Sequence, residues 1–287
     1  MNRLLLIAGV ACALALSCKK ETPSLQQEGN ETELTFTAGG VFSAEVTTKT
    51  STVESLSNSG FYVSATTGDA GSETSYWSST KFTKTSSDNT KYSASKYWPA
   101  TNPGLHFYAS NITNTFTAQG ATVSATNDTD VVCAYLPTPS FKTVNQLQFN
   151  HIFARIGMCY LTAPTGYTGG TLTATLVPKT GGTYNLRTGQ WPTVTTASSP
   201  ATIASSFKSE SACDLYVVPG SYDITVTYTL SKGDYQDSFT KTATVVLQAG
   251  KINSINATVP EGEATDIKFS VSIQPWTNNN ITSVEFQ

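Results

Sequence analysis

Charged side chains are scarce in this chain. Only 13% of the 287 residues are Asp, Glu, Lys or Arg, and 17 basic against 20 acidic side chains give a net charge of −3. This balance provides no positive field that would attract a nucleic acid, so we expect no nucleic-acid partner. Thr and Ser occupy most polar positions instead.

Residues typical of catalytic and metal sites are also few. The chain contains two His, His106 and His151, and no GxSxG, HExxH or P-loop pattern. Asp128 and Asp130 lack the spacing of an EF-hand and are interpreted as solvated loop acids. A Ser-His-Asp triad is spatial and stays open, but no motif points to one. We therefore expect no enzyme activity, no cofactor and no metal site.

Cysteine usage gives no disulfide framework. Of five Cys, Cys12 falls in the N-terminal apolar run and Cys18 directly after it, which leaves Cys133, Cys159 and Cys213. These three are an odd number, have no CxxC spacing, and each stands in an apolar run. They are interpreted as small buried hydrophobes, with a disulfide or reactive thiol as the less favoured alternative.

The N-terminus has the pattern of a targeting segment. Arg3 precedes an uncharged apolar run over residues 4–16, which is shorter than the ~20 residues that a membrane-spanning helix needs. The run therefore predicts a signal peptide over residues 1–17. A Cys after a small residue at its end resembles a lipobox, so Cys18 is the predicted lipidation site, with cleavage of the chain before it. The alternative is an ordinary signal peptide with an incidental Cys. Residues 18–32 are polar and predict a flexible tether.

Strand patterns recur along the rest of the chain. Apolar residues alternate with Thr or Ser in segments 34–38, 61–65, 105–109, 171–176, 223–230, 239–247 and 267–273. Period-2 alternation indicates strands, and a face of Thr and Ser opposite an apolar face is typical of antiparallel sheets with one dry side. No window longer than ten residues has a convincing helical period.

Turn signals divide these segments. They are Pro137-Thr138-Pro139, Gly169-Gly170, Gly181-Gly182 and Pro219-Gly220. Many short strands without a long helix predict an all-β fold of antiparallel β-sandwiches. One sandwich needs about 100 residues, so we expect two in tandem, over residues 33–144 and 145–287, with the boundary in Pro137–Asn145.

An ordered set of short motifs resembles one protein family, the fimbrillin (Mfa-like) family. The motifs are KYWP at Lys96–Pro99, LHFYA at Leu105–Ala109, FNHIFARI at Phe149–Ile156, LYVVP at Leu215–Pro219, AGK at Ala249–Lys251 and IQPW at Ile273–Trp276. No single motif is specific, but their order covers nearly the whole mature chain.

The resemblance implies a subunit of type V pili, the fimbriae of Bacteroidales. It implies two transthyretin-like β-sandwich domains and a location in the outer membrane, at the cell surface and in the fimbrium. In that family a surface protease cuts after a basic residue and removes the lipidated leader with the first strand. A strand of a neighbouring subunit then enters the emptied groove. The partners implied are other fimbrial subunits and, for adhesion, ligands on host or bacterial surfaces.

The N-terminal part of this implied mechanism maps onto residues 33–49. Leu34, Phe36 and Ala38 alternate and would fill the groove as the removable first strand. Lys49 is the next basic residue and lies in a polar stretch suited to proteolysis, so the cut is expected between Lys49 and Thr50. The family's best-known members have Arg at this point, and the alternative is a solvated surface Lys.

The candidate donor strand lies in residues 266–287. Its apolar positions are Ile267, Phe269, Val271 and Ile273, then, after a break at Pro275 to Asn280, Ile281, Val284 and Phe286. For the first set alone, the favoured interpretation is the last strand of the second domain. The second set is an alternating terminal strand, which invites pairing.

A second function class stays open, a lipid-anchored surface protein that binds glycans. Of four Trp, Trp98 and Trp276 stand next to Pro and are interpreted as core residues. Trp77 and Trp191 stand in polar stretches read as loops, where they could stack against sugars.

Overall fold

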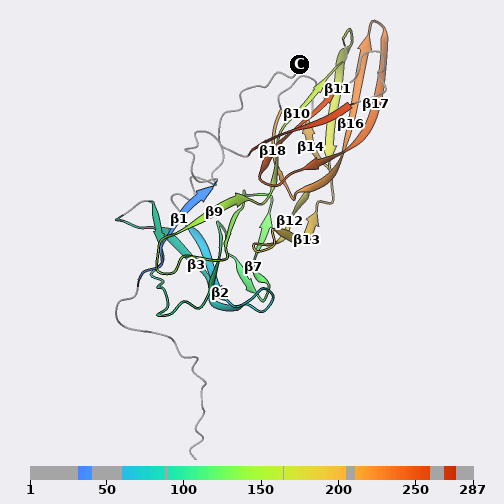
Figure 1. The fold of residues 1–287 in the computed structure, drawn as a ribbon. Helices are drawn as coiled ribbons and strands as arrows, with labels where there is room; N and C mark the ends of the chain where they lie inside the picture. The colour runs from blue at the N-terminus through green and yellow to red at the C-terminus, as the bar shows by residue number, and fades with distance from the viewer. Residues whose placement is uncertain are drawn as a thin grey trace, which may run out of the picture.

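The computed structural model describes residues 32–40, 60–87, 90–163, 165–204, 211–258 and 268–275. Within these residues every regular element is a strand, and none is a helix. The all-β class predicted from the sequence is therefore confirmed. The described strands form a barrel and three four-stranded sheets, with the barrel toward one end of the molecule and the strands of the C-terminal half toward the other (Figure 1).

The N-terminal strands close into a seven-stranded barrel. In ring order they are β1 (Phe36–Gly40), β4 (Lys91–Ser93), β3 (Thr74–Lys84), β2 (Phe61–Thr67), β5 (Leu105–Ser110), β8 (Val132–Leu136) and β9 (Asn145–His151). The opposed sheets expected for a sandwich are thus continuous with each other in this half. An aromatic core that includes Phe61, Phe82, Phe107 and Phe149 fills the barrel.

The C-terminal strands form two sheets around a second core. One sheet has the order β15 (Ser211–Val217), β10 (Ala154–Thr162), β18 (Lys251–Thr258) and β19 (Lys268–Pro275). The other has the order β14 (Ala201–Ala204), β11 (Thr168–Leu176), β16 (Gly220–Lys232) and β17 (Tyr235–Leu247). Their shared core draws residues from both sheets, as a sandwich requires.

The alternation of apolar residues with threonines explains which face of each strand is buried. In β16, Ile224, Val226 and Tyr228 are fully buried. The intervening threonines face outward and pair with threonines of β17, with 2.9 Å between the hydroxyls of Thr225 and Thr242. Such cross-strand pairs stabilise a hairpin and fix its register.

A third sheet joins the two halves of the chain. Its order is β13 (Gln190–Thr196), β12 (Lys179–Asn185), β7 (Gly120–Thr126) and β6 (Thr115–Thr117), so strands from both sides of residue 145 pair with each other. A third hydrophobic cluster, which includes Tyr108, Val123, Phe153 and Leu186, packs beside it. The barrel and the C-terminal sheets are therefore connected by backbone pairing as well as by the chain.

Two predicted turns are wrong. Gly169-Gly170 lies inside β11 and Gly181-Gly182 inside β12. At Gly181 the strand approaches β7 so closely that a Cβ would lie 2.0 Å from the carbonyl oxygen of Ala125, and its φ is +150°. Glycine is needed there for close approach rather than for a turn.

Candidate functional site

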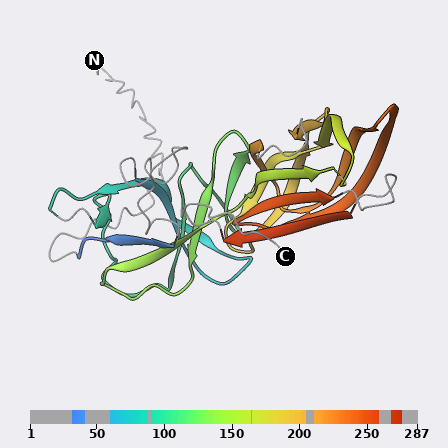
Figure 2. The ribbon, with the colours of Figure 1, turned by 90° about the horizontal axis from the view of Figure 1, so that it is seen from above.

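The candidate functional site is the slot that β1 occupies in the barrel. β1 runs antiparallel to β4 and parallel to β9, and it lies beside β9 in both views (Figure 1 and Figure 2). In the ring order it is the only strand between β4 and β9. The barrel is therefore closed by a strand that arrives from the N-terminal end of the chain.

Backbone hydrogen bonds hold the segment before β1 along both edges. On the β4 side, the Leu34 amide donates to the Lys96 carbonyl at 2.7 Å, and the Trp98 amide donates to Thr32 at 3.0 Å. On the β9 side, the Asn145 amide donates to the Thr35 carbonyl at 3.3 Å. The pairing thus begins about four residues before β1 itself.

The side chains of this segment fill the barrel core. Leu34 and Phe36 have no exposed surface, and Ala38 is partly buried against the same cluster. The Phe36 ring meets Phe82 and Phe107 edge to face, with centroids 5.2 and 5.0 Å apart. Burial of each large apolar side chain is worth about 1.5–3 kcal/mol.

The slot sets requirements for any strand that fills it, in backbone pairing and in side-chain type. Without residues 32–40, β4 and β9 would each keep an unpaired edge, and the places of Leu34 and Phe36 would be empty. Unpaired edges beside an apolar cavity are a template for another strand. The slot calls for two large apolar residues at positions i and i+2. A Cβ at the Gly39 position would lie 2.6 Å from the side-chain Nε2 of Gln146, a flexible group that would have to move aside.

The C-terminal candidate donor is described only in part. β19 pairs antiparallel with β18, in a register that sets Phe269 opposite Ala257, Val271 opposite Ile255 and Ile273 opposite Asn253. This segment is thus paired within its own chain, at one edge of the sheet. Ile267, Ile281, Val284 and Phe286 lie outside the described residues, as do Cys18, Lys49 and Thr50.

The two Trp considered for sugar stacking are strand residues, and the prediction that they lie in loops is wrong. Trp77 belongs to β3, where its ring packs on Phe107 with centroids 5.8 Å apart and its Nε1–H donates to the Val63 carbonyl at 3.3 Å. Trp191 belongs to β13 and packs on Phe153 and Tyr184. Each lies against a different hydrophobic cluster. Trp98 is a core residue, as predicted.

His151 and Asp130 form a buried pair. The Nδ1 atom of His151 lies 2.8 Å from a carboxylate oxygen of Asp130, and both residues are almost fully buried. The interpretation of Asp130 as a solvated loop acid is therefore wrong. Among the described residues, no three His, Cys, Asp or Glu side chains gather closely enough to hold a metal ion.

Sequence reasoning missed a buried polar cluster between the halves of the chain. The carboxylate of Glu73, which is 4% exposed, accepts hydrogen bonds from Tyr108 at 2.8 Å, from Thr66 at 2.9 Å and from Arg187. Burial, followed by the hydrogen bond to Glu73, raises the pKa of Tyr108 well above its usual range. Arg187 also lies over the Tyr135 ring, 5.8 Å from its centroid. Arg is scarce in this chain, and that scarcity is the one sequence signal that could have pointed to Arg187.

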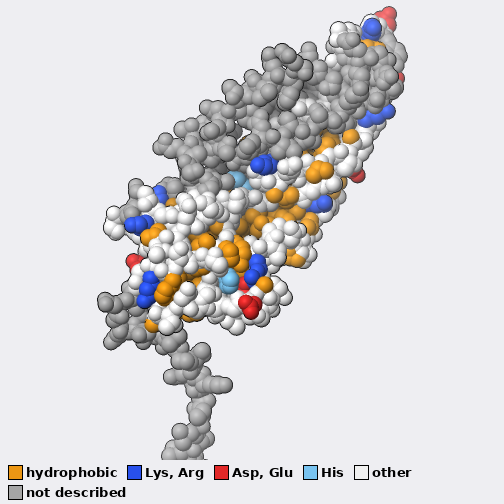
Figure 3. Space-filling view, viewed as in Figure 1, with side chains coloured by type: hydrophobic (Ala, Val, Ile, Leu, Met, Phe, Trp, Pro, Cys, Tyr) orange, Lys and Arg blue, Asp and Glu red, His pale blue; other side chains and the backbone are white. Residues whose placement is uncertain are grey.

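The described surface carries few charges. On the face shown in Figure 3, Lys and Arg side chains are scattered among hydrophobic and uncharged atoms, and Asp and Glu are sparser still. Buried Cys133 behaves as an apolar core residue, because burial raises the pKa of its thiol far above the usual range. In the part of the chain that the structure describes, no helix is long and apolar enough to cross a membrane.

Taken together, the strand pairing defines an all-β protein in which an N-terminal strand completes a barrel. Comparison with known proteins then gives the family. The Fimbrillin-like family profile matches residues 44–276. The chain belongs to the fimbrillin-like family.

Several solved structures are similar over most of the chain. A candidate cell adhesion protein of Bacteroides uniformis ATCC 8492 is 15% identical, with a TM-score of 0.48, over 86% of this chain and 98% of that one. A fimbrial assembly protein of Parabacteroides distasonis ATCC 8503 is 9% identical, with a TM-score of 0.35, over 85% of this chain and 99% of that one. No curated protein sequence matches this chain.

Proposed function

We propose that this chain is a non-enzymatic structural subunit of cell-surface fimbriae that polymerises by strand exchange at the β1 slot and supports adhesion. The observation that carries the proposal is the position of residues 32–40. They close the barrel between β4 and β9, and they bury Leu34 and Phe36 completely. Membership of the fimbrillin-like family supports the same function.

The proposed sequence of events begins with the lipidated chain at the outer membrane. Acylated Cys18 holds it there, and the first strand keeps the barrel core covered. A surface protease cuts after Lys49, and residues 18–49 depart. The open slot then receives a strand of another copy or of a related fimbrial subunit.

We place the donor in the C-terminal segment. Val284 and Phe286 are two apolar residues at positions i and i+2, the same spacing as Leu34 and Phe36. The earlier apolar set, which includes Phe269 and Val271, belongs to a strand already paired with β18. Residues 281–287 are therefore the better donor, with β19 remaining in its own subunit.

The N-terminus of the protein on the cell surface tests this proposal. The measurement is mass spectrometry of the chain from outer-membrane and from sheared-surface fractions. We expect an acylated N-terminus at Cys18 in the membrane fraction and a start at Thr50 in the sheared fraction. Lys49→Ala should abolish the second species, whereas Lys84→Ala should leave it unchanged. Sheared fibres that start at Cys18 would overturn the proposal.

The glycan-binding alternative through Trp77 and Trp191 has no observation in its favour. A stacking surface needs exposed ring faces close together, and these two rings pack against separate hydrophobic clusters. Unchanged sugar binding after Trp77→Ala and Trp191→Ala would remove it.

A further inference from the structure

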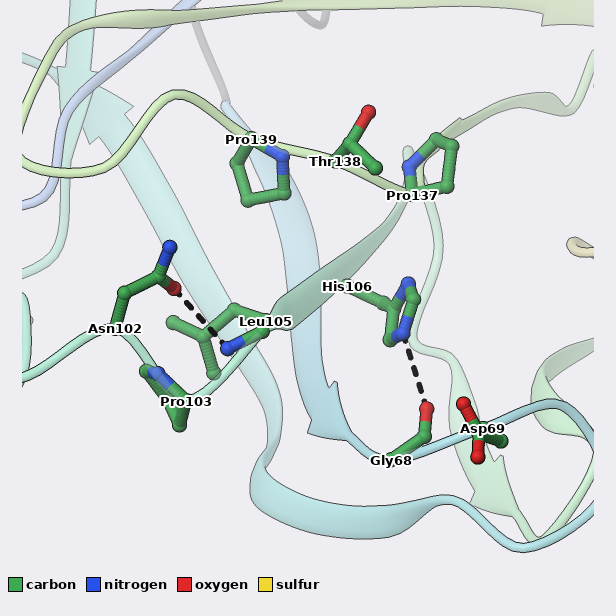
Figure 4. Close-up of a pocket in the computed structure, with 10 residues that line it drawn as sticks. Gly68, Asp69, Asn102, Pro103, Leu105, His106, Pro137, Thr138 and Pro139 are labelled. Atoms are coloured by element: carbon green, nitrogen blue, oxygen red, sulfur yellow. Dashed lines mark hydrogen bonds between the residues drawn. The ribbon is translucent and has the colours of Figure 1, made fainter.

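A pocket of about 350 Å³ opens where three loops of the barrel meet (Figure 4). The turn after β2 contributes Gly68 and Asp69, the segment before β5 contributes residues 102–104, and the loop between β8 and β9 contributes residues 137–139. Its volume falls in the range of about 300–1,000 Å³ that is usual for small-molecule sites. The pocket lies outside the β1 slot and has no part in the proposed strand exchange.

The pocket combines apolar walls with polar ends. Pro137 and Pro139 line one side and Pro103 the other, while the side chains of Asn102 and Asp69 lie toward opposite ends (Figure 4). Asp69 is the only charged residue in the lining. A ligand would therefore meet aliphatic rings along its length and hydrogen-bonding groups at each end.

The amide of Asn102 is held in one orientation. Its side-chain oxygen accepts the Gly104 amide at 3.0 Å. The amide nitrogen points away from that bond toward Pro139 (Figure 4). Since the oxygen is engaged, Asn102 presents the donor end of its side chain to a ligand.

The turn that carries Asp69 is held by His106. A ring nitrogen of His106, Nε2, lies 3.1 Å from the Gly68 carbonyl oxygen, which can only accept, so Nε2 carries the proton. The His106 ring also stacks on Tyr135, with centroids 6.4 Å apart at 26°. The Ser72 amide donates to the Asp69 carbonyl at 3.1 Å, which fixes the far side of the turn. His106 is thus a positioning residue for the carboxylate.

We propose that this pocket binds a neutral sugar unit of a surface glycan. The Asp69 carboxylate would accept hydrogen bonds from sugar hydroxyls, and the Asn102 amide would donate to a hydroxyl or ring oxygen. The C–H faces of the sugar would lie on the proline rings, where their burial is favourable.

The lining also selects against other ligand classes. An acidic sugar or a phosphate would meet the Asp69 carboxylate, and the lining contains no Lys or Arg to offset the repulsion. A lysine side chain could pair with Asp69 but has no acceptor for the Asn102 amide, so it would use only one end of the pocket. A neutral polyhydroxyl ligand uses both ends.

Binding of the soluble chain from Lys19 onward to a glycan array tests the inference. The array carries glycans that end in neutral hexoses and glycans that end in uronic or sialic acids. A lysine-rich peptide, spotted on the same surface, represents the competing cationic ligand. We expect binding to at least one neutral class. Asp69→Asn and Asn102→Ala should each weaken that binding about tenfold, because the first replaces a charge-assisted hydrogen bond with a weaker neutral one and the second removes a hydrogen bond. Asp234→Asn, in the exposed turn between β16 and β17, is the matched control and should change nothing.

Three outcomes would overturn the inference. They are binding to no glycan at millimolar concentration, glycan binding that Asp69→Asn and Asn102→Ala leave intact, and binding of the lysine-rich peptide in place of any glycan. Circular dichroism of each variant confirms the fold. Fibre formation is scored separately, and Asp69→Asn should assemble normally, so failure of this inference and failure of the proposed strand exchange are distinguishable.

Discussion

The guanidinium of Arg187 donates to the buried carboxylate of Glu73, 114 residues earlier in the chain. Arg187 lies in the turn between β12 and β13, and Glu73 lies directly before β3 of the barrel. Next to this pair, the Leu186 amide donates to the Ala121 carbonyl at 3.0 Å. The hairpin of β12 and β13 is therefore joined to the barrel by this ion pair and to β7 by backbone pairing.

Arg187→Ala should destabilise the protein by about 3 kcal/mol, because removal of one partner leaves a buried charge without compensation. Urea denaturation measures the change in the free energy of unfolding. Lys84→Ala, on an exposed strand position, is the control and should stay within about 0.5 kcal/mol of the parent.

The double variant Arg187→Ala with Glu73→Gln separates charge from packing. It should recover part of the lost stability, because the neutral amide no longer needs a cation. Equal stabilities of the single and double variants would show that the carboxylate is not the source of the cost.

Leu34→Ala and Phe36→Ala should each lower the free energy of unfolding of the uncut chain, by about 2–5 and about 3–5 kcal/mol. Both side chains are fully buried in the barrel core. Thr37→Ala, at a partly buried position of the same strand, should cost much less. A loss at Thr37 equal to the loss at Phe36 would contradict the placement of the strand.

Gly181→Ala should disrupt the sheet that joins the halves. Its Cβ would lie 2.0 Å from the Ala125 carbonyl oxygen, and backbone cannot yield as a flexible side chain can. Gly71→Ala is the matched control, because Gly71 also has a positive φ, +86°, but has nothing within 4 Å. Thermal unfolding should show a much larger loss at position 181, and equal losses would refute the close approach.

Stability should fall as the pH rises above 10. Burial, with a smaller contribution from Cys133, raises the pKa of Tyr184 from 10.0 to about 12, and burial also raises the pKa of Tyr92, Tyr108 and Tyr222. The unfolded chain releases these protons near pH 10 while the native protein retains them, so the native state binds more protons and loses stability with rising pH. Tyrosinate absorbance should therefore show exposed tyrosines titrating first and the buried ones only with unfolding.

The sequence predicts best those strands that bury one face and expose the other. Phe36, Val63 and Val226 stand in clear alternation, and each lies buried in the strand expected for it. β13 is exposed along most of its length, so its apolar and polar residues do not alternate. The sequence around Trp191 therefore resembles a loop. The Gly pair in β12 looks like a turn unless its neighbour β7 is known.

Contacts between distant segments were beyond prediction from one sequence. Glu73 and Arg187 are both charged residues, which sequence patterns place on the surface, and only the meeting of β12 with β7 buries them together. The pocket is formed by three loops far apart in the chain, and the one signal among them, Pro137-Thr138-Pro139, predicts a turn but not a pocket.

A reversible lock on the first strand tests the central claim most directly. Thr37 of β1 lies opposite Gln146 of β9, so Thr37→Cys with Gln146→Cys should form a disulfide that ties β1 into the slot. After cleavage at Lys49, the account predicts that the oxidised variant stays monomeric and that a reductant starts fibre growth, while each single variant polymerises under both conditions. Fibres that form from the oxidised variant with its disulfide intact would show that polymerisation does not require β1 to leave the barrel.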